Sequence, residues 1–140
     1  MDEDRQERAD AVWNRACDAM AADEPPERTG DAMLMRAIAF DGEVHANGLL
    51  DRLERDGVDE AIEALRWFGL TDAAERVERI SEEWRRLAAS DGGVSDEAMD
   101  ELDAEADRVW FEEPQDMVAD QLTAALLARL GDDPTAFSPI

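Results

Sequence analysis

The chain of 140 residues contains one cysteine, one histidine and no lysine. Because Cys17 stands alone, an internal disulfide is excluded and a reducing compartment is favoured. The longest apolar run, residues 34–40, is interrupted by Arg36, and the first ten residues are charged. We therefore expect neither a membrane span nor a secretory signal, and we expect the cytoplasm as the location.

The same scarcity argues against catalytic and metal sites. Without lysine there is no phosphate-binding loop of the nucleotide triphosphatase type. His45 has no Glu-x-x-His partner, and a calcium loop starting at Asp41 would place Ala46 and Arg52 where glycine and glutamate are required. Cys17 precedes Asp18, which disfavours its thiolate. We expect no metal, no cofactor and no enzymatic activity.

The formal net charge is −23, and every one of the fourteen positive charges is an arginine. Such a chain is not expected to bind nucleic acid, anionic membranes or acidic substrates directly, since all are anions. The charge is concentrated: residues 96–120 hold eleven acidic residues and one arginine, whereas residues 25–95 hold sixteen and nine. Two interpretations follow. Either the charge forms a surface for a basic partner, or the protein is a structural or adaptor domain whose acidity serves solubility or salt adaptation.

Apolar residues recur at intervals of three and four along most of the chain, and no stretch alternates with a period of two. This spacing is typical of amphipathic helices. We expect an N-terminal amphipathic helix within residues 1–24. A second helix is expected from Gly30, with Thr29 as its N-cap, to about Asn47-Gly48, followed by a short helix over residues 49–53.

Capping residues divide the second half of the chain. Asp59, Thr71 and Ser95 are each expected to cap a helix, Gly69 to end one, and Pro114 to begin the last. The predicted fold class is all-α. It is a single domain, residues 1–140, of about seven short helices packed around one core, with an irregular tail over residues 131–140.

Two aromatic residues adjoin the acidic region. Because Trp110 and Phe111 are neighbours in sequence, one of them is expected to point outward. There it would either anchor a partner or cover the final helix. Trp84 lies in phase with an apolar stripe and is expected in the core.

The segment after Ser95 poses an electrostatic problem. Asp96 and Glu97 fall in the first helical turn, where the helix dipole favours negative charge. Five later acids lie beyond this turn: Asp100, Glu101, Asp103, Glu105 and Asp107. Like charges four residues apart cost a few tenths of a kcal/mol per pair. The helix dipole therefore does not offset the mutual repulsion of these five carboxylates.

The segment FDGEVHANGLLDRLERDGVDEAIEALRWFGLTDAAE, residues 40–75, resembles the bacterial double-stranded-DNA-mimic family. The signature of this all-helical family joins an acidic-hydrophobic pair to an Asn-Gly-Gly step, which Glu43, Asn47 and Gly48 match here. A downstream Glu-Ala-Leu helix that ends in glycine matches too. The chain departs from the pattern at Leu49, where a second glycine is usual, and at Arg52, where glutamine is common.

The resemblance implies a binding protein that presents carboxylates where a basic helix-turn-helix regulator or nucleoid protein expects DNA phosphates. Acids one turn apart along a helix approximate the spacing of phosphates along one strand. A homodimer would match a regulator that binds two half-sites. The residues expected to bind the partner are Asp96, Glu97, Asp100, Glu101, Asp103, Glu105, Asp107, Asp116 and Asp120.

Overall fold

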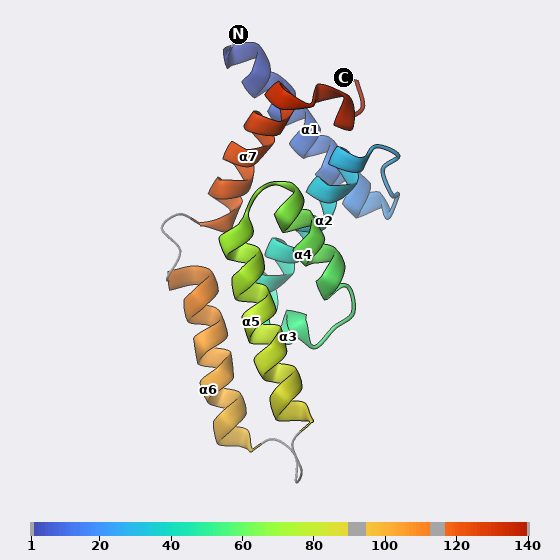
Figure 1. The fold of residues 1–140 in the computed structure, drawn as a ribbon. Coiled ribbons are helices and arrows are strands. Elements are labelled where there is room, and N and C mark those ends of the chain that lie inside the picture. Colours follow the sequence, from blue (N-terminus) through green and yellow to red (C-terminus); the bar gives the residue numbers. More distant parts are fainter. Residues whose placement is uncertain (1, 90–94, 113–116, 140) are drawn as a thin grey trace.

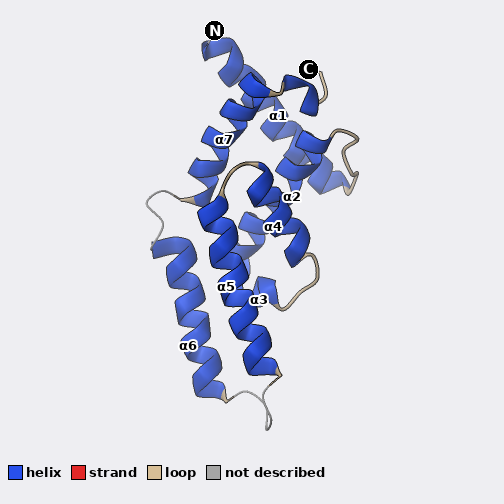
Figure 2. Ribbon diagram, in the orientation of Figure 1, coloured by secondary structure: helices blue, strands red, loops and turns tan. Residues whose placement is uncertain are grey.

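The computed structural model describes residues 2–89, 95–112 and 117–139, and within them it contains helices and no strand (Figures 1 and 2). The all-α prediction is confirmed. The seven α-helices are α1 (Asp2–Ala22), α2 (Thr29–Asn47), α3 (Leu49–Leu53), α4 (Val58–Trp67), α5 (Thr71–Ala88), α6 (Asp96–Asp107) and α7 (Val118–Asp132). A π-helical turn, Arg108–Glu112, follows α6, and a 3₁₀ turn, Pro134–Ala136, follows α7. None of the described helices is both long and apolar enough to cross a bilayer.

The apolar core consists of two adjoining clusters. The first holds Phe40 and Trp110 and joins the C-terminal half of α2 to α3, α4, α5, α6 and the π-helical turn. The second holds Leu34 and Phe137 and joins α1, the N-terminal half of α2 and α7. Because α2 and α4 contribute side chains to both clusters, the domain is continuous along its long axis (Figure 1).

Two of the predicted helix boundaries, at Ser95 and Gly69, have the expected caps. The hydroxyl of Ser95 accepts a hydrogen bond from the backbone N–H of Ala98 (3.1 Å), as an N-cap should. Gly69 has a φ of 76° and ends α4, with its N–H donating to the carbonyl of Arg66 and that of Leu70 to Leu65, both at 2.9 Å. This pairing is the Schellman motif.

Other caps differ from the prediction. Helix α2 begins at Thr29 itself, and the N-cap position belongs to Arg28, whose guanidinium donates to the carbonyl of Thr135 in the tail (3.4 Å). Helix α4 begins at Val58 after Gly57, whose left-handed φ of 92° turns the chain before Asp59 can cap it. Thr71 is likewise the first residue of α5 and not its cap. Pro114 lies outside the described residues.

The tail, expected to be irregular over residues 131–140, is described from the end of α7 to Pro139 and is held against α1 and α2. Phe137 is buried in the second cluster. Asp31, also buried, accepts hydrogen bonds from the backbone N–H of Ser138 (2.8 Å) and from the guanidinium of Arg15 (2.7 Å). Arg15 also donates to the carbonyls of Ser138 and Pro139, each at 3.1 Å. The one buried carboxylate of this region is thus fully paired.

The close approach of the tail to α2 gives a first prediction. A Cβ added at Gly30 would lie 2.7 Å from the carbonyl oxygen of Ala136 and 2.8 Å from the Phe137 ring. We expect Gly30→Ala to lower the free energy of unfolding in urea by about 1–3 kcal/mol, as overpacking does. Gly42→Ala is the matched control on the same helix. No atom lies within 4 Å of its added Cβ, so it should stabilise by about 0.5–1 kcal/mol. Equal effects of the two substitutions would contradict the described docking of the tail.

Candidate functional site: the acidic surface of α6 and α3

Helix α6 is attached to the domain by one narrow apolar side. Leu102 and Ala106 are buried, and Met99 packs against the first cluster. Most of the remaining positions are exposed, and α6 lies along an outer edge of the molecule beside α5 (Figure 1). Its exposed carboxylates are Asp96, Glu97, Asp100, Glu101 and Asp103, and its half-buried ones are Glu105 and Asp107. One helix therefore displays seven of the nine predicted partner-binding residues.

The other two predicted residues do not extend this array. Asp116 lies outside the described residues. Asp120 is exposed in the first turn of α7, a separate helix, so it belongs to none of the rows on α6.

Two further acids, which sequence reasoning did not include, join α6 from α3. A hollow of about 280 Å³ lies between the two helices, and Leu50 and Met99 provide its apolar part. Asp51 and Glu54 line it from the α3 side, and Asp100 and Asp103 from the α6 side. We call the seven carboxylates of α6 together with Asp51 and Glu54 the acidic surface. Asp51 and Glu54 follow the apolar stripe of α3 on its polar side, but the sequence contains no sign that α3 packs on α6.

Few positive charges neutralise the acidic surface. Within the described part of the chain, Glu105 is the carboxylate of α6 that has an ion-pair partner, Arg79 at 3.8 Å. On α3, Asp51 pairs with Arg55 at 3.1 Å. The acidic surface therefore retains most of its negative charge.

The crowding of carboxylates affects the protonation of Asp103. Partial burial raises the pKa of Asp103 above its usual value, and the negative charges of Asp107 and Asp100 raise it further. Both causes disfavour the ionised form. The aspartates at positions 100, 103 and 107 are thus close enough to repel one another in the folded protein.

The Asn47-Gly48 step lies at the edge of this surface. Gly48 has a φ of 91°, donates its N–H to the carbonyl of Val44 (2.8 Å) and joins α2 directly to α3. A Cβ at this position would lie 3.4 Å from Oδ1 of Asp107, an atom that is buried and receives no hydrogen bond from the described residues. Asn47 lines the hollow between α3 and α6. The tight turn therefore sets α3 against the acidic helix.

Glu43, the third signature residue, holds the same turn through Arg52. The two side chains form an ion pair, and Arg52 also donates to the carbonyl of Asp56 (3.0 Å). The guanidinium of Arg52 lies 5.2 Å from the ring centre of Phe40. Arg52, a departure from the family pattern, thus connects α2, α3 and the start of the next loop.

The aromatic pair after α6 turns inward. Trp110 is buried and donates its indole N–H to the Asp41 carboxylate (3.1 Å), which His45 approaches at 3.4 Å. Phe111 is half-buried against the first cluster and meets the His45 ring edge-on, with ring centres 5.0 Å apart. Neither ring is the exposed anchor that the sequence allowed, because the wide π-helical turn places both against the domain. Trp84 packs against the same cluster.

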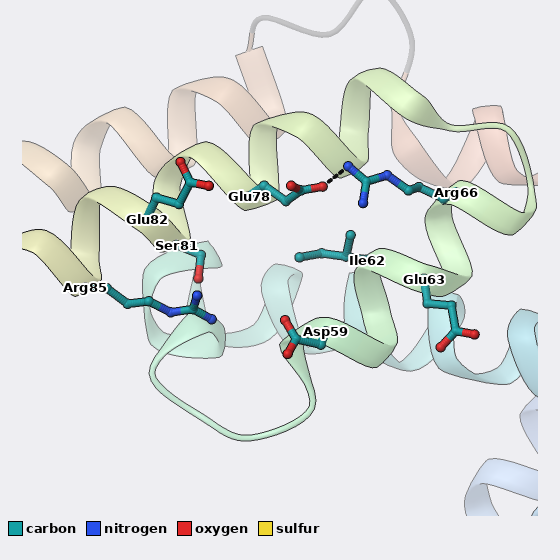
Figure 3. Close-up of a pocket in the computed structure, with 8 residues that line it drawn as sticks. All are labelled: Asp59, Ile62, Glu63, Arg66, Glu78, Ser81, Glu82 and Arg85. Atoms are coloured by element: carbon teal, nitrogen blue, oxygen red, sulfur yellow. Dashed lines mark hydrogen bonds and ion pairs between the residues drawn. The ribbon is translucent and has the colours of Figure 1, made fainter.

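Elsewhere, a cleft of about 390 Å³ separates α4 from α5, and Arg66 and Glu78 form an ion pair across it (Figure 3). Its lining holds two arginines and four carboxylates and so has charges of both signs. No three His, Cys, Asp or Glu side chains in the described ranges are arranged to hold a metal ion.

Comparison with known protein families, curated proteins and solved structures finds no match for the chain.

The raised pKa of Asp103 gives a second prediction. A raised folded-state pKa means that the folded protein binds the proton more tightly, so ionisation of Asp103 lowers stability as the pH rises through that pKa. We expect Asp103→Asn to raise the free energy of unfolding at neutral pH, with the gain disappearing at acid pH where Asp103 is protonated. Urea unfolding at several pH values measures this. Asp4→Asn on α1 controls for the loss of one net charge. Equal gains in the free energy of unfolding from both substitutions would show that ionised Asp103 is repelled no more strongly than an ordinary surface acid.

Proposed function

We propose that the protein is an acidic DNA mimic, which occupies the DNA-binding surface of a basic helix-turn-helix regulator or nucleoid protein. The observation that carries the proposal is the outward array of α6, where seven carboxylates on one helix are joined by two from α3 and few are paired. The resemblance of residues 40–75 to the DNA-mimic family points to the same function.

Electrostatics explains why such a surface would bind a basic partner. Carboxylates that repel one another in the free protein gain favourable contacts when arginine and lysine side chains replace water and counterions beside them. The repulsion around Asp103 is therefore relieved on binding. Strong dependence of affinity on salt follows, as it does for DNA itself.

The geometry of α6 supports mimicry over a general attraction. Acids four residues apart rise about 6 Å along a helix, which is close to the rise over two phosphates of one DNA strand at about 3.4 Å each. Asp96 with Asp100, and Glu97 with Glu101 and Glu105, form such rows. Asp51 and Glu54 supply charge on the opposite side of the hollow, as a second strand does across a groove. A homodimer would present two such surfaces to a symmetric regulator.

A capture experiment tests the proposal. Immobilised protein is incubated with lysate of the source organism at low and high NaCl, and bound proteins are identified by mass spectrometry. We expect a basic DNA-binding protein that elutes with salt and with competing duplex DNA. The triple variant Asp100→Asn, Glu101→Gln, Asp103→Asn should lose at least about tenfold in affinity, since close charge pairs across interfaces couple strongly.

A matched control removes three exposed acids from another surface. Glu3→Gln, Asp4→Asn and Glu7→Gln on α1 change the net charge by the same amount as the α6 variant. If both triple variants capture the partner equally, or if any acidic protein does, the acidic surface is not the binding site.

One observation favours the second function, an adaptor or structural domain whose acidity serves solubility in concentrated salt. Exposed acids also occur on α1, far along the sequence from α6, at Glu3, Asp4, Glu7 and Asp10. A salt-adapted protein loses stability at low salt, where its own charges repel unscreened. If the protein is a mimic, it should remain folded at low NaCl and bind most tightly there. Circular dichroism during NaCl dilution, beside the capture assay, separates the two functions.

A further inference from the structure

A second surface of the molecule is mostly apolar. A hollow of about 380 Å³ lies between the C-terminal end of α1, the middle of α2 and the start of α4. Met20, which is 40% exposed, lies at this surface. The apolar side chains that line the hollow are Ala19, Met20, Met35, Ala39, Phe40 and Ala61.

This hollow continues along α2. A neighbouring hollow of about 340 Å³ shares Ala19, Glu24 and Pro25 with it and reaches Asp31. Along α2 the combined lining therefore runs from Asp31 to Phe40, a rise of about 14 Å at 1.5 Å per residue. We call the two hollows together the α1–α2 groove. Its length corresponds to about two and a half turns of a helix laid beside α2.

The charged rim of the groove is negative. Asp23, Glu24 and Glu60 are exposed and belong to its lining. The three arginines in the lining are each paired with an acid. Arg52 forms an ion pair with Glu43, Arg36 lies 3.8 Å from Glu63, and Arg15 lies 2.7 Å from Asp31. The field at the groove therefore favours a cationic ligand with an apolar side.

Asp23 ends α1 at the rim of the groove. Among the described residues it is the non-glycine residue with a positive φ, 55°. It ends α1 in the manner of a Schellman glycine: its N–H donates to the carbonyl of Met20 (3.3 Å), and the N–H of Glu24 donates to Ala19 (2.9 Å). Glycine would adopt this conformation without strain. Aspartate also tolerates it, and at this position it places a carboxylate at the rim of the groove.

We infer that the α1–α2 groove binds a short amphipathic helix of a partner protein, with apolar side chains on one face and lysine or arginine beside them. Helices bind grooves through apolar anchors at positions i, i+3 or i+4, and i+7, which span about two turns. Met20 and Met35 provide a flexible thioether lining that adapts to such anchors. A second copy of this chain, with a net charge of −23, is disfavoured at this acidic rim, so the homodimer considered above would form through another surface. The inference does not depend on the acidic surface of α6.

A designed peptide tests the groove directly. The probe is a fluorescein-labelled helix of leucine, alanine and lysine, with its leucines at i, i+3 and i+7. The control is a peptide of the same composition in scrambled order, which has the same charge but no apolar face. Fluorescence anisotropy at physiological ionic strength should show the amphipathic peptide binding about tenfold more tightly, as expected when buried anchors carry the affinity. NMR shift changes should map to the groove.

Paired variants locate the binding. Met20→Gln should weaken binding about fivefold or more, whereas Met117→Gln, at an exposed methionine (37%) that precedes α7, should not. Asp23→Gly should also weaken binding while leaving the thermal midpoint of unfolding unchanged or higher, which separates loss of the carboxylate from loss of the fold. Glu3→Gln, at an exposed acid in the first turn of α1, is the control for its charge.

Four outcomes would overturn the inference. They are equal binding of the scrambled peptide, equal effects of Met20→Gln and Met117→Gln, shift changes confined to α6, or tighter binding of dodecylammonium than of the peptide. The last would show a site for small amphiphiles. None of these outcomes bears on the acidic surface, whose test uses the α6 variant.

Discussion

The apolar attachment of α6 is the constraint on which the acidic surface depends. Six pairs of acids on α6 lie three or four residues apart, and at a few tenths of a kcal/mol per pair their repulsion costs about 2 kcal/mol. Burial of one large apolar side chain contributes about 1.5–3 kcal/mol, and Leu102, Val109 and Trp110 are all buried. The apolar side therefore outweighs the repulsion and holds the carboxylates outward in the absence of a partner.

The turn at Gly48 connects this attachment to the rest of the domain. It sets α3 against α6, and the ion pair between Glu43 and Arg52 holds the two ends of the turn together. Trp110 reaches from the π-helical turn to Asp41 on α2. Glu43 and Gly48 thus have a structural task in this chain, which is to position the charged helix. The folding role lies in the same region as the proposed binding role.

Much of the fold could be predicted from local patterns. The stripe of Leu49, Leu50 and Leu53, the cap at Ser95 and the ending at Gly69 depend on neighbours in sequence, and the structure confirms them. Features that depend on distant residues could not be predicted. Asp31 is buried because the tail brings the N–H of Ser138 to it. Asp51 and Glu54 join the acidic surface because α3 packs on α6, a contact that no local pattern encodes.

Displacement of DNA tests the central claim most directly. A labelled duplex is first bound to the DNA-binding protein that the capture experiment identifies. The acidic protein described here is then titrated into this complex, and the fluorescence anisotropy of the duplex is measured. The account predicts that the duplex is released stoichiometrically, and that the variant with Asp100, Glu101 and Asp103 neutralised does not release it. Retention of the duplex, or a ternary complex with higher anisotropy, would show that the acidic surface does not take the place of DNA.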